Sequence, residues 1–321
     1  MQPDVVVSDT GKARLLDKLS RDLGPKVSGA LFAPETIEIL LNPDGSVWQE
    51  CLGQAPQEIG TLSAASALGA IQTIAAMLGV VVTRESPLLE GELPLDGSRF
   101  AGQIPPVVDR PVFAIRRKAS SVFTLDQYVE TGVMTLHHAN IIRDAVRDHK
   151  NIVVVGGTSS GKTTFLNAVL QEMVRQYPDE RFVTIEDTRE LQCKARNLLS
   201  YKTSTQVTMT QLLRTTLRMR PDRIIVGECR GPEALDLIDA WNTGHEGGGG
   251  TIHANSPAAG LTRLRSLVSR NPAAPREIEP LIGEVVHLLV YMAKVPGKGR
   301  RVLDVLAVSG YANGAYITQP L

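Results

Sequence analysis

The residues with the clearest chemistry lie in the stretch NIVVVGGTSSGKTTF, residues 151–165. An apolar run leads into two glycines and a polar turn, so that backbone N–H groups can surround a phosphate chain at the start of a helix. In such a loop the lysine reaches the β- and γ-phosphates, and the hydroxyl after it ligates Mg²⁺. The stretch therefore predicts a site for a nucleotide with Mg²⁺, and we take the nucleotide to be ATP. The predicted binding residues here are Gly156, Gly157, Thr158, Ser159, Ser160, Gly161, Lys162, Thr163 and Thr164.

Two acidic positions follow predicted strands further along the chain. Glu228 ends the stretch RIIVGE, and Glu186 and Asp187 end the stretch TIED. Phosphate-loop enzymes need a carboxylate at the end of a neighbouring buried strand, near the metal or the attacking water. Glu228 and Glu186 are the predicted catalytic carboxylates, with Lys162 beside them, and Glu186 also joins Thr163 as a predicted metal ligand. The residues leave open which carboxylate activates water.

The stretch TGHEGGGGTIHAN places His245 and His253 on either side of four glycines. Glycine costs backbone entropy and adds no side chain to a core, so we interpret the run as a flexible loop without a packing role. The two histidines are predicted to sense the nucleotide state and are included among the catalytic residues. We expect His253, in a predicted strand, to point at the phosphates, and His245 to face another subunit.

Arginines recur near these motifs. An arginine that reaches a γ-phosphate from a neighbouring subunit is a recognised way to couple subunits. Solvated helix faces and salt bridges are the ordinary alternative for each. The candidates are Arg99, Arg116, Arg117, Arg214, Arg218, Arg220, Arg223 and Arg230.

From residue 151 onward, apolar strands alternate with amphipathic helices. This pattern is typical of βαβ units and of a parallel sheet buried on both faces. The last strands, after residue 286, are predicted to extend the sheet in an antiparallel way. The predicted fold class is therefore α/β, with a RecA-like phosphate-loop core and a mainly parallel sheet.

Residues 1–118 are predicted to form a smaller α+β domain. A helix is expected over residues 11–24, a hairpin around the turn NPDG, and a helix over residues 61–79 that opens on a Thr cap. The polar, small-residue stretch near residues 119–128 is the predicted linker, and residues 129–321 form the predicted ATPase domain.

Composition narrows the class of protein. The 321 residues hold 34 basic and 34 acidic side chains and only 4% aromatics, which argues against a nucleic-acid coat or a polybasic membrane anchor. The three cysteines form no CxxC pair, so neither a disulfide framework nor a cysteine zinc site is indicated. We expect a soluble cytoplasmic protein whose membrane contact is peripheral and made through a partner.

The order of the motifs resembles the secretion ATPase superfamily. Its members are hexameric motors of type II secretion, type IV secretion and type IV pili, and their Walker A, Asp box, Walker B and His box elements correspond to the phosphate loop, IEDTRE, RIIVGECRG and TGHEGGGGTIHANS. The short N-terminal domain and the His box look most like the conjugative-transfer branch, the TrbB-type traffic ATPase. The absence of a four-cysteine module argues against the type II branch, and a tight-adherence pilus ATPase stays open.

The resemblance implies ATP hydrolysis to ADP and phosphate, self-association into a ring of six, and work on a secretion or conjugation machine at the cytoplasmic face of an inner membrane. It further implies that Arg116 and Arg117 contact the nucleotide phosphates. Sequence-specific nucleic-acid binding is not expected. A nucleic-acid ring motor is the alternative from another class, and it requires a basic, aromatic-lined channel. A GTPase would carry an Asn-Lys-x-Asp motif, which the sequence lacks, and a scaffold that binds ATP without turnover also remains open.

Overall fold

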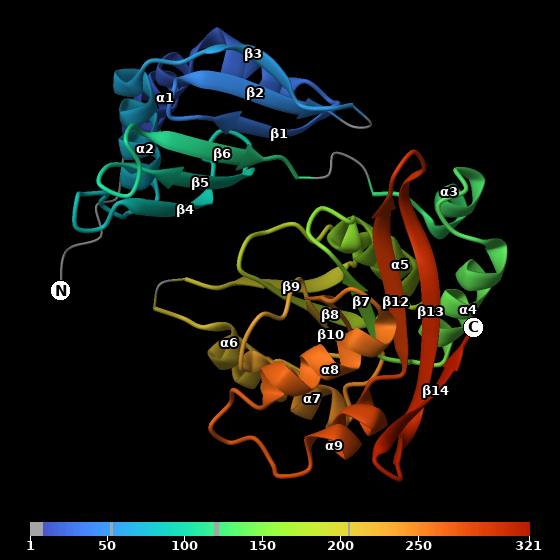
Figure 1. Ribbon diagram of the computed structural model, residues 1–321. Coiled ribbons are helices and arrows are strands. Elements are labelled where there is room, and N and C mark those ends of the chain that lie inside the picture. The colour runs from blue at the N-terminus through green and yellow to red at the C-terminus, as the bar shows by residue number, and fades with distance from the viewer. Residues whose placement is uncertain (1–8, 52–53, 119–121, 205) are drawn as a thin grey trace. The chain divides into compact units, whose positions relative to one another are not determined.

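The computed structural model describes residues 9–51, 54–118, 122–204 and 206–321, and the chain forms two compact units, residues 1–120 and 121–321 (Figure 1). The predicted linker begins with residues 119–121, which lie outside the described residues. Its last residues belong to a helix, Leu125–Glu130, of the second unit. A hinge at this linker therefore stays a prediction.

The first unit is an antiparallel sheet of six strands covered by two helices. The strand order is β3-β2-β1-β6-β5-β4, and each neighbouring pair runs antiparallel. The expected hairpin at NPDG is confirmed, because Leu41 pairs with Val47 across the turn. The elements are α1 (Asp9–Phe32), β1 (Thr36–Leu41), β2 (Ser46–Cys51), β3 (Gln57–Thr61), α2 (Ala64–Met77), β4 (Leu88–Glu92), β5 (Arg99–Gln103) and β6 (Val112–Arg116).

Both helices of this unit depart in detail from the simple pattern. Helix α1 bends at Gly24, whose φ of 73° is followed by Pro25. The predicted Thr cap of α2 is wrong: Thr61 ends strand β3, and Ser63 caps the helix by accepting a hydrogen bond from the Ser66 N–H at 3.1 Å. Pairing of Thr61 with the sheet leaves the next hydroxyl along the chain to satisfy the helix end.

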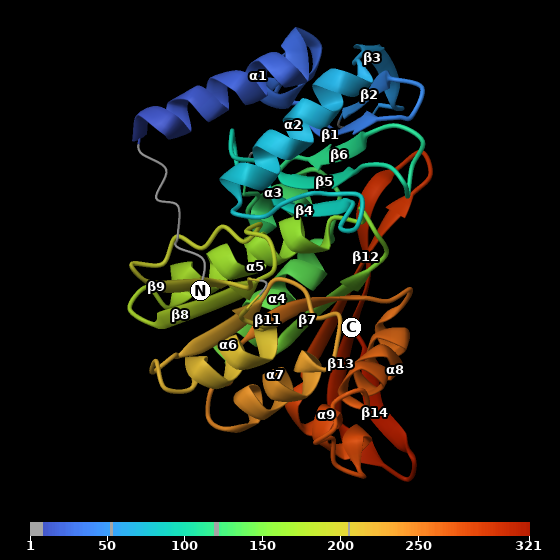
Figure 2. The same ribbon diagram turned by 90° about the vertical axis from the view of Figure 1, so that its left-hand side faces the viewer.

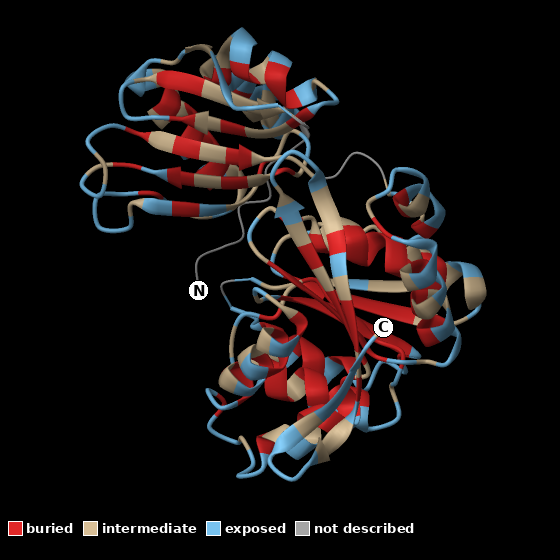
Figure 3. Cartoon of the chain, turned by 45° about the vertical axis from the view of Figure 1, so that its right-hand side comes forward, coloured by how far each residue is buried: buried red, intermediate tan, exposed pale blue. Residues whose placement is uncertain are grey.

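The second unit is built on an eight-stranded sheet of order β14-β13-β12-β7-β11-β10-β8-β9. The strands from β12 to β9 run parallel, and β13 and β14 are antiparallel additions. Figure 3 shows the buried central strands. The predicted α/β class with a mainly parallel sheet is confirmed. The strands are β7 (Ile152–Gly156), β8 (Arg181–Glu186), β9 (Asn197–Lys202), β10 (Arg223–Val226), β11 (Gly249–His253), β12 (Leu288–Val295), β13 (Gly299–Ala312) and β14 (Ala315–Pro320).

Helices cover both faces of this sheet (Figure 1 and Figure 2). One core cluster joins α6, α7, α8 and α9 to the sheet, and the other joins α3, α4 and α5 to the opposite face. The helices are α3 (Leu125–Glu130), α4 (Leu136–Arg147), α5 (Lys162–Gln176), α6 (Met209–Thr216), α7 (Glu233–Asn242), α8 (Pro257–Val268) and α9 (Ile278–Val285).

Three details of this unit were not predicted. Strand β12 was expected to join the sheet antiparallel but runs parallel to β7, with Leu288 opposite Ile152. Strand β9 escaped prediction because it is an edge strand whose residues are half-buried or exposed. Helix α9 was also missed. None of these differences changes the arrangement that matters for the site: β7, β11, β10 and β8 end side by side at one edge of the sheet.

Candidate nucleotide site

The phosphate loop lies between β7 and α5, and its backbone needs glycine at two points. A Cβ on Gly156 would lie 2.3 Å from the Met292 carbonyl oxygen, and Gly161 has a φ of +95°. The first turn of α5 then presents N–H groups that no side chain caps. The Oγ of Ser160 is buried and has no hydrogen-bond partner within the described part of the chain. The loop therefore offers buried, unsatisfied polar groups suited to an anion.

Lys162 occupies this loop with its side chain folded inward. It is 7% exposed, and its Nζ donates to the Gly157 carbonyl oxygen at 2.8 Å. The same Nζ lies 3.4 Å from His253 Nδ1. Thr163 and Thr164 follow on the first turn of α5 and are half-buried. The predicted lysine and hydroxyls are thus assembled at the helix N-terminus.

Glu228 lies just past the end of β10 and is held from two sides. Its Oε1 is 2.6 Å from His253 Nε2, and its Oε2 accepts hydrogen bonds from the Arg230 guanidinium, with Arg230 Nε at 2.7 Å. Burial and the Lys162 ammonium hold the pKa of His253 below its ordinary value, against the opposing attraction of Glu228. A neutral His253 with its proton on Nε2, the nitrogen in close contact with Glu228 Oε1, keeps Nδ1 as an acceptor for Lys162. The three predicted residues form one connected group.

Glu186 ends β8 and is buried, with 4% of its surface exposed. Its Oε1 accepts hydrogen bonds from the backbone N–H groups of Glu190 and Leu191, each at 2.8 Å. A Cβ on Gly227 would lie 2.9 Å from Glu186 Cγ, so the glycine before Glu228 makes room for this side chain. The carboxylate is fixed in a defined position at the same edge of the sheet.

Asn167 is a further site residue that the sequence did not reveal. It is 1% exposed on α5, five positions after Lys162. Its Nδ2 donates to the Glu190 carbonyl oxygen at 3.1 Å, and its Oδ1 accepts from the Gln192 N–H at 2.8 Å. Asn167 therefore ties the helix of the phosphate loop to the segment that holds Glu186. A polar residue inside the apolar face of a predicted helix was the available signal.

The structure does not bring His245 to this group. His245 precedes β11, whereas His253 ends it, so the two histidines lie toward opposite ends of that strand. Arg116 and Arg117 belong to the first unit, where the Arg117 guanidinium donates to the Ala33 carbonyl oxygen and its N–H donates to the Ile37 carbonyl oxygen at 2.9 Å. The site roles of these three residues stay predictions.

The interpretation of the glycine run as a flexible loop without a packing role is wrong. Residues 247–250 are buried, and Gly249 and Gly250 are the first two residues of β11. A Cβ on Gly248 would lie 2.0 Å from Trp241 Nε1, and one on Gly247 would lie 2.7 Å from Arg223 Nη1. Glycine is required because an indole and a guanidinium pack directly onto this backbone.

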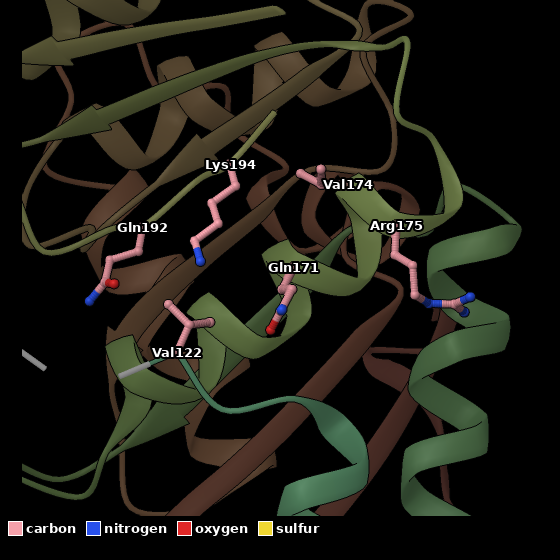
Figure 4. A pocket seen from close by; sticks show the side chains of 6 residues that line it. All are labelled: Val122, Gln171, Val174, Arg175, Gln192 and Lys194. Atoms are coloured by element: carbon pink, nitrogen blue, oxygen red, sulfur yellow. The ribbon is translucent and has the colours of Figure 1, made fainter. Parts of the chain in front are cut away.

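A separate hollow of about 210 Å³ lies beside α5 (Figure 4). In Figure 4, Gln171 and Arg175 project from α5, and Gln192 and Lys194 come from the segment after β8. None of Lys162, Glu186, Glu228 and His253 lines it. The hollow is thus distinct from the phosphate loop.

The arrangement defines a class of protein before any comparison. A parallel α/β sheet with a phosphate loop after one strand, and carboxylates after two neighbouring strands, is the architecture of a RecA-like nucleotide hydrolase. Residues 64–290 match the family described as Type II/IV secretion system protein. The chain belongs to this family.

Relatives along the full length agree. The chain is 47% identical to a probable conjugal transfer protein TrbB of Sinorhizobium fredii, over 94% of this chain and 92% of that protein. It is 33% identical to the type IV secretion system protein PtlH of Bordetella pertussis, over 86% of this chain and 91% of that one. The predicted conjugative-transfer branch of the superfamily is confirmed, and the chain is a traffic ATPase of the type IV secretion class.

Solved structures support the fold. The crystal structure of the VirB11 ATPase from the Brucella suis type IV secretion system is 27% identical, with a TM-score of 0.50 over 92% of this chain and 96% of that one. The pilus retraction motor PilT is only 16% identical but has a TM-score of 0.63, over 92% of this chain and 82% of that one. At that identity the likeness to PilT concerns the fold alone.

Proposed function

We propose that the chain hydrolyses ATP at the edge of the sheet where β7, β11, β10 and β8 end. The observation that supports this most directly is the connected group of Lys162, His253 and Glu228 beside the glycine-rich loop. Loop N–H groups and Lys162 hold the phosphates, and Glu228 accepts a proton from the attacking water. His253 orients Glu228 and accepts from Lys162 while it is neutral.

Mg²⁺ fits the residues of this site. The described residues contain no cluster of three or more His, Cys, Asp or Glu side chains that could hold a metal. Mg²⁺ in phosphate sites instead keeps several waters and takes one or two protein ligands together with substrate phosphates. Thr163, on the first turn of α5, and the buried Glu186 supply such a pair, and bound Mg²⁺ would neutralise charge on the phosphates.

We further propose that hydrolysis changes the angle between residues 1–118 and 129–321 about the linker at 119–128, and that a ring of six copies converts this change into work. The type IV secretion and conjugal transfer names of the relatives favour DNA–protein complexes or pilus subunits as the load. Among the described residues, no helix has the length and apolar character needed to cross a bilayer. The proposed location is the cytoplasmic face of the inner membrane, reached through machinery partners.

The test combines turnover with binding. Wild-type chain should release phosphate from ATP, Lys162→Ala should lose ATP binding, and Glu228→Gln should keep binding while its kcat falls by about 100-fold to 1,000-fold. Unchanged turnover in Glu228→Gln would show that Glu228 is not the base. The ring is tested separately by solution mass with and without a non-hydrolysable ATP analogue, and a monomer under both conditions would contradict it.

A further inference from the structure

Strands β12 and β13 form a hairpin, and the turn and adjoining strand ends of this hairpin are basic. The stretch KVPGKGRR, residues 294–301, holds four basic residues and no acidic one. It lies beyond residues 64–290, the part that matches the family. Within the hairpin, Arg300 is opposite Lys294 in the register of the two strands.

Arg300 is the hairpin residue that reaches the phosphate loop. Its Nε donates to the Ser159 carbonyl oxygen at 3.2 Å. Its Cδ lies 3.0 Å from the point where a Cβ on Gly161 would stand, so the missing side chain of Gly161 gives Arg300 room to approach. The arginine is half-buried against the loop.

The base of the hairpin is anchored, which fixes the approach of Arg300. Strand β12 pairs with β7, the strand that leads into the phosphate loop. On the other strand, the Val302 N–H donates to the Val133 carbonyl oxygen at 2.9 Å. Arg300 is therefore presented to the loop by two backbone attachments rather than by a free turn.

The charge of Arg300 is not neutralised by the protein around it. In the part of the chain that the structure describes, no carboxylate forms an ion pair with it. Its ionisable neighbour is Tyr128, whose pKa is raised by burial while Arg300 acts in the opposite direction. One guanidinium nitrogen is used on Ser159, and the planar fork has further N–H donors that match phosphate oxygens.

We propose that Arg300 binds the phosphate chain of the nucleotide, as a cationic residue that the C-terminal hairpin of the same subunit adds to the phosphate loop. The inference rests on the proposed nucleotide site and deepens it. Its neighbour Arg301 has another role: Arg301 Nη1 donates to the Arg300 carbonyl oxygen at 2.8 Å, and alternate residues of a strand face opposite sides. Arg301 is thus a matched control with the same charge in the same hairpin.

The experiment measures ADP and non-hydrolysable ATP analogue affinities by calorimetry on the full chain. Arg300→Gln is expected to weaken both by about tenfold, as for loss of one charge-assisted contact, and the loss should shrink at high salt. Arg300→Lys, which keeps the charge without the fork, should lie between Arg300→Gln and wild type. Arg301→Gln should match wild type within about twofold.

Two results would overturn the proposal. If Arg300→Gln binds as Arg301→Gln does, Arg300 makes no phosphate contact. If the loss is independent of salt, Arg300 supports the loop only through Ser159. Lys162→Ala keeps this question separate from the site itself: if wild type and Lys162→Ala bind the nucleotides equally, the proposed nucleotide site is wrong, whatever Arg300 does.

Discussion

The parallel strands of the eight-stranded sheet end at one edge and begin at the other. Both edges carry polar side chains of the same chemical types, but their exposure to solvent differs. At the edge where β7, β10 and β11 end, His253 contacts both Lys162 and Glu228, and 42% of the His253 side chain is exposed. At the edge where these strands begin, Asn151 and Arg223 are 0% exposed. The edge where the strands end, the open edge, is accessible to a ligand. The edge where the strands begin, the closed edge, is not.

The closed edge is saturated with internal bonds. Asn151 Nδ2 donates to the Val285 carbonyl oxygen at 2.9 Å, and its Oδ1 accepts from the Gly248 N–H at 2.8 Å. Its own N–H donates to His287 Nδ1 at 3.0 Å, and burial lowers the pKa of His287, which favours the neutral ring that can accept. These bonds join the starts of β7 and β11 to the end of α9. The position of a polar residue in the sheet, rather than its type, decides here whether its role is structural or chemical.

Replacement of Arg223 should have the largest effect at the closed edge. Its guanidinium bonds Glu180, donates to the Gly247 carbonyl oxygen at 2.9 Å and lies 4.7 Å from the Tyr177 ring. Arg223→Met removes the cation and leaves Glu180 without it, so the free energy of unfolding should fall by about 3 kcal/mol. Denaturant unfolding measures this. The exposed Arg218→Met is the control and should be nearly neutral. Loss of ATP binding without loss of stability would place Arg223 with the site instead.

The glycine run tests the closed edge by volume rather than by charge. Gly248→Ala would bring a Cβ within 2.5 Å of the Ile224 carbonyl oxygen as well as against Trp241. Overpacking of this kind costs about 1–3 kcal/mol, measurable as a lower denaturation midpoint. Gly250→Ala, two positions further along the chain, is the matched control, because the nearest atom to its Cβ would be the Val226 carbonyl oxygen at 3.3 Å. Equal stability of the two variants would restore the flexible-loop interpretation.

The sequence predicted the open edge well and the closed edge poorly, for a physical reason. Lys162, Glu186, Glu228 and His253 each follow or end an apolar run, and parallel strands bring such ends to one edge without further information. The need for glycine at Gly248 depends on Trp241, which approaches from another helix. Hydrophobic periodicity and secondary-structure propensity do not predict that contact.

Long sequence separations explain the other omissions. Arg300 contacts Ser159 across 141 positions, and only the path of the β12–β13 hairpin brings them together. Asn167 binds residues 23 and 25 positions away in a segment without regular structure. Arginine is common on strand surfaces, so Arg300 could not be selected from its type and spacing. For Asn167 the only signal was its place inside the apolar face of a predicted helix, which does not show what the side chain binds.

Asn167 and Asn151 allow the same substitution to be compared at the two edges. Each is buried, donates to one backbone carbonyl and accepts from one backbone N–H. Asn167→Ala and Asn151→Ala should lose similar stability, about 1–3 kcal/mol each. Only Asn167→Ala should disturb Glu186, and we expect its kcat to fall about tenfold and its Mg²⁺ requirement to rise. Phosphate release over a Mg²⁺ titration measures both, and equal titrations for the two variants would make Asn167 purely structural.

The smallest effect concerns pH and His253. Because its pKa is held below the ordinary value of 6.5, the folded state favours the neutral ring. The unfolded chain then binds the proton more readily, so this contribution to stability is complete above pH 6.5 and is lost as pH falls below it. Activity should decline in the same window, because a protonated Nδ1 faces the Lys162 ammonium and can no longer accept from it. His253→Gln should remove part of that decline. The ratio of kcat at pH 7.5 to kcat at pH 5.5 should be about twofold to threefold smaller in His253→Gln than in wild type. His245→Gln, at the far end of β11, is the control. An identical acid limb in wild type and His253→Gln would assign the decline to another group and leave His253 with only a positional role on Glu228.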